Sequence, residues 1–124
     1  KEQSARRNIM IKAAVMCLAL AIYHESRGEP EHGQYAVAEV VMNRSIQKNI
    51  SVCDVIYEKG QFSGAKNWKV PKENSSWLKS LEVANNVLNG VNTNYSNGSM
   101  YFRVASLSPK NKQTIRIGNH VFYK

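Results

Sequence analysis

The stretch CLALAIYHESRGEP, residues 17–30, ends an apolar run with a histidine, a glutamate and a corner that contains glycine and proline. Residues 5–25 are rich in alanine and apolar almost all round, which is typical of a central core helix. Gly28 ends this helix, and Pro30 suits the first position of the next one. The stretch therefore predicts a buried helix that ends on an acid, Glu25.

Three further helices are expected downstream. Residues 30–48 form the second helix, because apolar residues recur there at helical spacing. Ser51 followed by Asp54 resembles a capping box and opens a short third helix. A fourth helix covers about 75–89, with an expected buried face made of Trp77, Leu78, Leu81, Ala84, Val87 and Leu88, and Gly90 closes it.

The pattern changes near the C-terminus. Three short segments, MYFRV at 100–104, TIRI at 114–117 and HVFY at 120–123, alternate or are rich in β-formers. The pair Gly118-Asn119 is typical of a tight hairpin turn. We therefore predict an α+β fold, mostly helical, with a small antiparallel sheet at the C-terminus.

The size and charge of the chain limit its organisation and partners. With 124 residues we expect a single domain over 1–124, in which residues 1–8 are a flexible or processed N-terminus. Seventeen Lys and Arg against nine acids give a net charge of +8, which suits an anionic partner or a merely basic surface. These bases are scattered, whereas a nucleic-acid binder concentrates them with aromatic residues, so we expect no nucleic-acid partner.

The apolar run at 9–23, IMIKAAVMCLALAIY, is too short for a membrane span. It contains Lys12, and a span needs about 20 residues. No small-residue cleavage site follows the run, so it does not fit a signal peptide well. We expect no integral membrane association and see no targeting segment in this chain.

Glu25 extends an apolar stripe of the first helix. Leu18, Ile22 and Glu25 lie at i, i+4 and i+7, on one helical face. Because burial disfavours a charged carboxylate, the pKa of Glu25 is expected to rise, and a protonated acid can protonate a leaving group. An alternative stays open, in which Glu25 pairs with Arg27 or Arg44 or accepts a hydrogen bond from a nearby amide.

Other chemistries fit the sequence poorly. His24, Glu25 and His32 do not have the H-E-x-x-H spacing that places two zinc ligands on one helical face, so we expect no metal and no cofactor. There is no G-x-S-x-G motif for a nucleophilic serine. Cys17 and Cys53 are compatible with one disulfide or with two buried thiols.

Three segments together resemble the catalytic domain of the SleB/CwlJ cell-wall hydrolase family, from about Cys17 to the C-terminus. They are YHESRGEPEHGQYAVAEVVMNR at 23–44, SVCDVIYEKGQFS at 51–63 and IRIGNHVFYK at 115–124. The resemblance implies a helical core similar to those of lysozymes and lytic transglycosylases, and cleavage of the glycan strands of peptidoglycan. It implies that Glu25 is the catalytic acid, cutting between N-acetylmuramic acid and N-acetylglucosamine.

The chain departs from the family's pattern at two positions. Ser26 stands where alanine is usual, which is a tolerable change. Gly64 stands where an aromatic residue is common, which removes a surface for sugar stacking, and Trp68 in the same loop is the candidate to replace it.

Candidate substrate-binding residues combine amide, hydroxyl and ring surfaces, as sugars require. They are Gln61, Phe62, Ser63, Tyr101 and Phe102. For Phe62 and Phe102, packing in the core is the competing interpretation. Asn43, expected at the end of the second helix, either caps that helix or holds Glu25 or a substrate acetamido group. His120 is interpreted as a surface residue.

The mechanism depends on whether a second acid takes part. Glu39 and Glu29 are the candidates, although Glu29 is also expected to pair with a base or to cap the second helix. If neither acts, the muramic acid 6-hydroxyl attacks C1 and the reaction is a lytic transglycosylation. The alternatives are a hydrolytic muramidase on the same fold, or a non-catalytic module that binds cell wall or nucleic acid.

The family resemblance also sets the expected location. We expect an exported bacterial enzyme or phage lysin, monomeric, that acts in the cell wall or periplasm. Because these compartments are oxidising, we expect Cys17 and Cys53 to form a disulfide.

Overall fold

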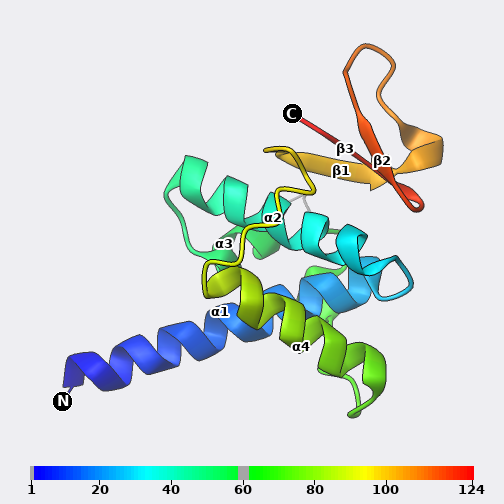
Figure 1. Ribbon diagram of the computed structural model, residues 1–124. Coiled ribbons are helices and arrows are strands. Elements are labelled where there is room, and N and C mark those ends of the chain that lie inside the picture. The colour runs from blue at the N-terminus through cyan, green and yellow to red at the C-terminus, as the bar shows by residue number, and fades with distance from the viewer. Residues whose placement is uncertain (1, 59–61) are drawn as a thin grey trace.

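The computed structural model describes residues 2–58 and 62–124 (Figure 1). Its helices are α1 (Glu2–Ser26), α2 (Glu31–Lys48), α3 (Val52–Tyr57) and α4 (Ser75–Leu88). Its strands are β1 (Tyr101–Val104), β2 (Ile115–Ile117) and β3 (His120–Tyr123), and short 3-10 helices cover Ala65–Asn67 and Ala105–Leu107. The predicted α+β fold, mostly helical with a small antiparallel sheet, is confirmed.

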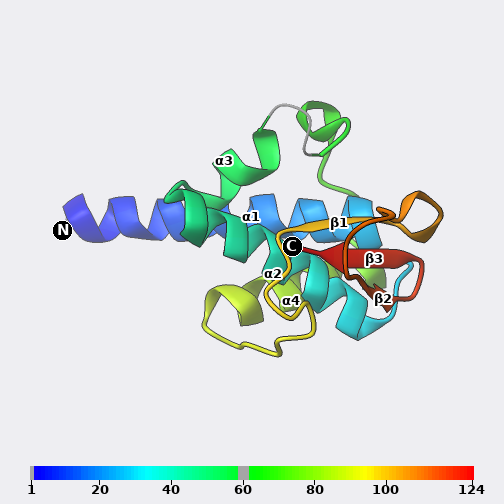
Figure 2. The same ribbon diagram turned by 90° about the horizontal axis from the view of Figure 1, so that it is seen from above.

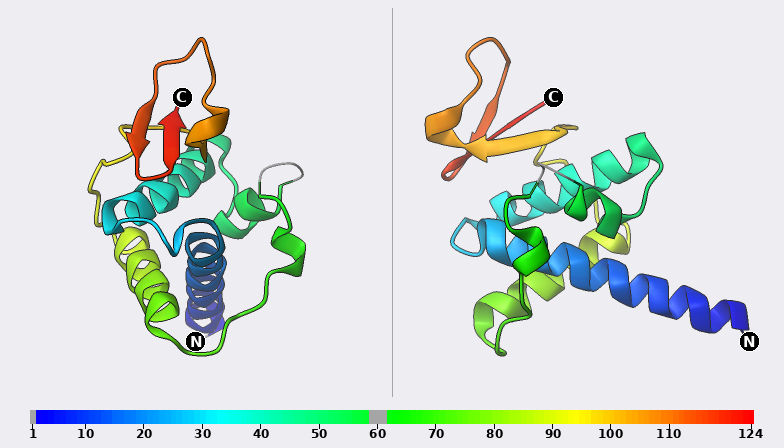
Figure 3. Two further views of the ribbon diagram at one scale, coloured as in Figure 1. Left: turned by 90° about the vertical axis from the view of Figure 1, so that its right-hand side faces the viewer. Right: turned by 180° about the vertical axis from the view of Figure 1, so that it is seen from behind.

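The second half of α1 is the centre of the core. Its residues from Leu18 to Ile22 are between 0 and 7% exposed. Seen end-on in Figure 3 (left), α1 has α4 on one side, α3 on the other, and α2 and then the sheet above it. The core helix is therefore wrapped on three sides, as its apolar circumference predicts.

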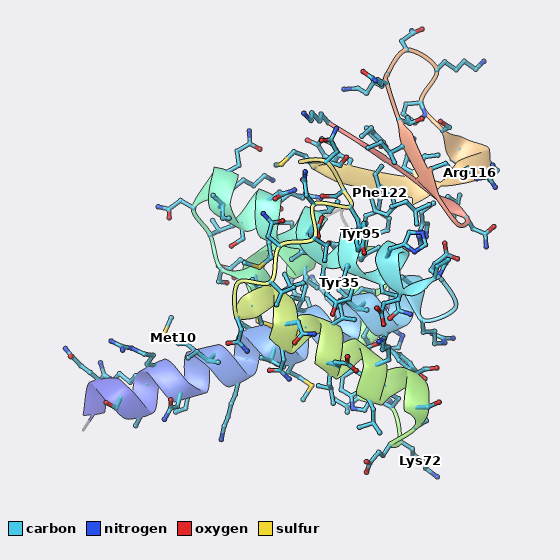
Figure 4. The ribbon with its side chains drawn as sticks, viewed as in Figure 1. Met10, Tyr35, Lys72, Tyr95, Arg116 and Phe122 are labelled. Carbon is cyan, nitrogen blue, oxygen red and sulfur yellow. A yellow bond between two sulfur atoms is a disulfide. The ribbon has the colours of Figure 1, made fainter. Side chains whose placement is uncertain are left out.

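The first half of α1 differs from the prediction. The helix begins at Glu2, three residues before the predicted start at residue 5, while the expectation that residues 1–8 are flexible or processed stays a prediction. This half projects from the rest of the molecule, as the position of Met10 in Figure 4 shows, and Ile9 and Met10 are 66 and 70% exposed. The apolar run is a core helix only in its second half.

Gln3–Ser26 is long and apolar enough to cross a bilayer, so the prediction that this run is too short for a membrane span was wrong. The core helix of a soluble protein and a signal sequence near the N-terminus meet the same two criteria. Leu18 and Ile22, in the second half of the helix, are fully enclosed by protein.

α2 is the middle layer between α1 and the sheet. On one side Ala38 and Val41 join the cluster around α1, and on the other Val37 and Val40 pack against Phe122 of the sheet. Seen from above, the strands lie over α2 and the C-terminal end of α1, while the N-terminal half of α1 extends away (Figure 2). A helix apolar on two faces thus connects the helical core to the sheet.

The helix ends follow local chemistry. The Ser51 side chain accepts a hydrogen bond from the Asp54 amide, which confirms the predicted cap of α3. Asn74 caps α4 in the same way, by accepting a hydrogen bond from the Trp77 amide, and this cap was not predicted. α4 ends one residue earlier than predicted, and Leu78 is 49% exposed, so its assignment to the buried face was wrong.

The sheet has the strand order β1-β3-β2, with both pairings antiparallel. Ile117 pairs with His120, which leaves Gly118-Asn119 as the two-residue turn that was predicted. Gly118 has φ 58°, a conformation that glycine adopts without strain at the first position of such a turn. By this strand order, the C-terminal strand β3 is the central one.

A disulfide joins Cys17 of α1 to Cys53 of α3, with their Cα atoms 5.3 Å apart. The predicted pairing is confirmed. The disulfide fastens α3, the shortest of the α-helices, to the core helix α1.

We predict that the double variant Cys17→Ser/Cys53→Ser is folded but less stable by roughly 3–4 kcal/mol, because the bridge closes a loop between residues 36 apart. Urea denaturation without reductant measures the difference. With a reductant present, the wild type should lose the same amount and the double variant should not change. Equal stabilities of the two proteins under non-reducing conditions would contradict this prediction.

Candidate active site

Glu25 lies in the last turn of α1, directly after the core segment. Ala21 and Ile22, one turn earlier on the same face, are fully buried. Glu25 itself is half-buried, and this burial raises the pKa of its carboxyl above the ordinary value. Glu25 thus lies at the end of an apolar stripe, as predicted.

The two arginines considered as partners of Glu25 are engaged elsewhere. The Arg27 guanidinium lies over the Tyr23 ring, 4.8 Å from its centroid. Arg44 is buried and its Nη2 is 3.2 Å from Oε1 of Glu58. Within residues 2–58 and 62–124, no hydrogen bond or ion pair holds the Glu25 carboxylate. Its pKa is therefore governed by burial and not by a cation.

A row of aromatic rings runs from the neighbour of Glu25 to the sheet. His24 stacks on Trp68, with ring centroids 5.1 Å apart. Trp68 contacts Phe62 at 6.0 Å, and Phe62 contacts Phe102 of β1, also at 6.0 Å. Phe102 in turn contacts His120 of β3 at 5.2 Å. The row joins the end of α1, the loop after α3 and the sheet.

The corner after α1 meets the far end of this row. The Glu29 amide donates to the Ser26 carbonyl at 2.9 Å, so Glu29 stays at the end of α1. Its carboxylate accepts hydrogen bonds from the backbone and side-chain nitrogens of Asn119, at 2.7 and 3.2 Å. Oε1 of Glu29 is also 3.7 Å from Nδ1 of His120. The segment 24–29 and the aromatic row thus form a closed ring of contacts.

This corner corrects two expectations. His120 is 7% exposed and is not a surface residue. Pro30, without a side-chain hydrogen bond, occupies the N-cap of α2, so Glu29 does not cap that helix. A side chain at 118 would displace the Glu29 carboxylate, because a Cβ there would lie 2.5 Å from its Oε1. In the sequence, Gly118-Asn119 predicted the turn, and the segment around it carried the family resemblance, but neither predicted the contact with Glu29.

The other predicted binding residues differ in their surroundings. Phe62 is 7% exposed and belongs to the core cluster, while Phe102 is half-buried against both clusters. Ser63 is exposed, and Tyr101 is 42% exposed and stacks on Tyr123. Gln61 lies outside the described residues.

A hollow of about 500 Å³ adjoins the loop that carries Phe62. Its lining combines apolar and polar side chains, from Ile56, Tyr57, Glu58, Phe62, Gly64, Ala65, Lys66 and Asn67. Such mixed walls suit a sugar, which has apolar ring faces and polar edges.

Asn43 and Glu39 hold the connection between α4 and the sheet. Nδ2 of Asn43 donates to the Ser99 carbonyl at 3.0 Å, and α2 continues beyond Asn43 to Lys48, so Asn43 does not end the helix. The Glu39 carboxylate, 6% exposed, accepts hydrogen bonds from the Ser96 amide and the Thr93 hydroxyl. Both side chains fix the loop that leads to β1.

Among the described residues no group of three or more His, Cys, Asp or Glu side chains is placed to hold a metal ion. The chemistry that the arrangement offers is that of a single acid with a raised pKa, next in the chain to the histidine that begins the aromatic row. The two other candidate acids, Glu29 and Glu39, both accept hydrogen bonds from backbone amides.

A helical core with a small sheet, and a half-buried acid at the end of the central helix, define a domain of the lysozyme-like class. The chain belongs to the cell wall hydrolase family, whose sequences match residues 28–123. The matched range begins three residues after Glu25.

Similar proteins cover most of the chain. A spore cortex-lytic enzyme of Bacillus cereus is 32% identical over an aligned length of 119, and the alignment covers 89% of this chain and 44% of that protein. A spore cortex-lytic enzyme of Oceanobacillus iheyensis is 31% identical, over 89% of this chain and 41% of its own length. The chain thus spans less than half the length of these relatives.

Two solved structures share the fold. The catalytic domain of the Bacillus cereus SleB protein superposes with a TM-score of 0.74 at 27% identity, covering 91% of each chain. The catalytic domain of the germination-specific lytic transglycosylase SleB from Bacillus anthracis gives 0.71, also at 27% identity, covering 90% of this chain and 93% of that one.

We predict that Glu25→Gln raises stability at neutral pH and leaves it unchanged in acid. The pKa of Glu25 is raised in the folded protein, so its stabilising contribution is complete below about pH 4.3 and is lost as the pH rises through the folded-state pKa. Urea denaturation between pH 3.5 and 7.5 should show a difference that grows with pH.

The control for this measurement is Glu82→Gln, whose side chain is 58% exposed. Its free energy of unfolding should stay within about 0.5 kcal/mol of the wild type at each pH. If Glu25→Gln were destabilised at neutral pH, Glu25 would be a structural ion-pair partner and not an isolated acid.

Proposed function

We propose that this domain cleaves the glycan strands of peptidoglycan, with Glu25 as the general acid. The observation that carries the proposal is a half-buried carboxyl with a raised pKa and no partner among the described residues, one residue after His24, whose ring begins a row of aromatic side chains. Membership of the cell wall hydrolase family supports the choice of substrate.

The first step needs a protonated acid. Glu25 transfers its proton to the glycosidic oxygen, so the departing sugar leaves as a neutral alcohol and positive charge develops at C1 of the remaining sugar. Burial supports this step because it keeps the proton on Glu25 at a higher pH than an exposed glutamate would allow. The new carboxylate then lies near the positive centre that it has helped to form.

The second step, in our proposal, is intramolecular. The 6-hydroxyl of N-acetylmuramic acid attacks C1, and the Glu25 carboxylate takes the proton of that hydroxyl. The product is a 1,6-anhydro sugar, no water is consumed, and Glu25 regains its proton. Two facts support this lytic transglycosylation: Glu29 and Glu39 are engaged by amides, and the related Bacillus anthracis domain carries the name lytic transglycosylase.

The remaining properties fit an enzyme that works outside the cytoplasm. The net charge of +8 suits an anionic wall, and its repulsion favours a monomer. The disulfide between α1 and α3 requires an oxidising compartment such as the cell wall or periplasm.

We predict that Glu25→Gln reduces the initial rate of lysis of purified cell walls by about 100-fold or more, because general acid catalysis contributes about that factor. Loss of turbidity measures the rate. Glu31→Gln serves as the control, because Glu31 is 59% exposed and forms an ion pair with Lys79 on α4. A Glu25→Gln protein that lyses walls at the wild-type rate would remove Glu25 from the mechanism.

We also predict the products. Released muropeptides should end in 1,6-anhydro-muramic acid, which is lighter by one water than a hydrolysis product and has no reducing end. Treatment with borohydride followed by mass spectrometry separates the two outcomes. Reducible muramic acid ends would instead indicate a hydrolytic muramidase with Glu29 or Glu39 as its base, and reducible glucosamine ends would move the cut to the other glycosidic bond.

A further inference from the structure

The mechanism above leaves one pair of enclosed ionisable groups unused. The side chains of Glu29 and His120 are each 9% exposed. Such burial of two groups that can carry charge is costly unless they have partners or a task. Glu29 has partners, since Asn119 donates two hydrogen bonds to it.

His120 is less well satisfied than Glu29. Its Nδ1 is buried and has no hydrogen-bond partner in the described part of the chain, and the nearest carboxylate oxygen, on Glu29, is 3.7 Å away. Its Nε2 makes no hydrogen bond within the described ranges either but, unlike Nδ1, this atom is not fully enclosed. The ring therefore has one nitrogen beside a carboxylate and the other partly accessible.

The place of His120 in the sheet fixes this orientation. The residues paired with it on the two neighbouring strands, Val104 and Ile117, are apolar. Its ring edge packs against Phe102 and Phe122, with centroids 5.2 and 6.3 Å away. Glu29 is the one charged side chain within ion-pair distance of it among the described residues.

The carboxylate selects the form of the ring. A neutral imidazole carries one proton, and a carboxylate oxygen beside Nδ1 favours the tautomer with the proton on that atom. Nε2 then carries a lone pair and accepts hydrogen bonds. A hydrogen-bond acceptor is thereby presented at the surface, next to Phe102 of the aromatic row.

We propose that His120 is a substrate-binding residue, whose Nε2 accepts a hydrogen bond from a hydroxyl or an acetamido N–H of the bound glycan, and that Glu29 is the positioning residue that orients it. The proposal rests on the proposed function for the class of ligand. It adds a residue that lies at the other end of the aromatic row from Glu25.

Protonation should weaken this contact. Burial lowers the pKa of His120, and the charge of Glu29 opposes this effect. At neutral pH the ring is therefore neutral and Nε2 accepts a hydrogen bond; below the folded-state pKa of His120, Nε2 becomes a donor and the contact is lost. Affinity for glycan should accordingly fall as the pH drops through that pKa.

The binding test uses protein with Glu25→Gln as background, so that soluble glycan fragments are bound and not cut. Adding His120→Phe keeps an aromatic ring but removes the acceptor, and should raise the Kd about 3- to 10-fold, as expected for one hydrogen bond. His120→Gln keeps an acceptor and should stay within about threefold of the background. His32→Phe, at an exposed histidine of α2, is the matched control and should not change the Kd.

The orientation test does not depend on activity. In protein with 15N-labelled histidine, the nitrogen shifts of His120 should show the proton on Nδ1. Glu29→Gln should reduce this preference and lower the pKa of His120, while Glu31→Gln should change neither. In otherwise wild-type protein, Glu29→Gln should raise KM and leave kcat within about twofold.

Several results would overturn the proposal. An unchanged Kd with His120→Phe, or with His120→Leu if the first variant does not fold, would remove His120 from binding. An unchanged tautomer in Glu29→Gln would remove Glu29 from its orientation. A large loss of kcat at constant KM in Glu29→Gln would make Glu29 a reacting acid. None of these outcomes would bear on whether Glu25 is the acid, because that depends on wall lysis by Glu25→Gln alone.

Discussion

The structure depends on the burial of a single helical segment, residues 18–22 of α1. α2, α3 and α4 all contact this helix, and the disulfide at Cys17 fastens α3 beside it. A segment so enclosed has a fixed direction and rotation, since a small turn about its axis would expose apolar surface worth about 25 cal/mol per Å². Glu25 follows directly after the segment on the same face. The packing of the core therefore sets the place of the acid without any hydrogen bond to it.

The three-stranded sheet is held by fewer contacts than the core segment of α1. The sheet packs on α2 through a small apolar cluster that includes Val37, Val40 and Phe122. Polar contacts add to this cluster at both ends: Asn43 holds the loop before β1, and Glu29 holds the tip of the β2–β3 hairpin. Because Glu29 belongs to the corner that follows Glu25, one short segment carries the acid and also holds the tip of the β2–β3 hairpin.

Sequence patterns predicted the parts of this structure that depend on local chemistry. The cap by Ser51, the turn at Gly118-Asn119 and the face of α1 that carries Glu25 each follow from spacing within a few residues. Other expectations were wrong because they concerned contacts between distant segments. Whether Leu78 is covered, or whether His120 meets Glu29, depends on the elements that pack there, which no local period reveals. The burial of Glu39 and Asn43 against the 91–99 loop escaped notice for the same reason.

In so basic a chain, no cation holds the Glu25 carboxylate in the described part of the structure. Glu58 shows the contrary case: hydrogen bonds and charge from Lys48, together with the nearby Arg44, hold its pKa below the ordinary value. A cation at the same distance from Glu25 would lower the pKa of its carboxyl. The two arginines considered as its partners are engaged elsewhere, since Arg27 lies on Tyr23 and Arg44 is bound to Glu58. A position at a helix C-terminus acts in the same direction, because the helix dipole disfavours a negative charge there. The contacts of these arginines are thus part of the reason why burial alone sets the direction of the pKa shift of Glu25.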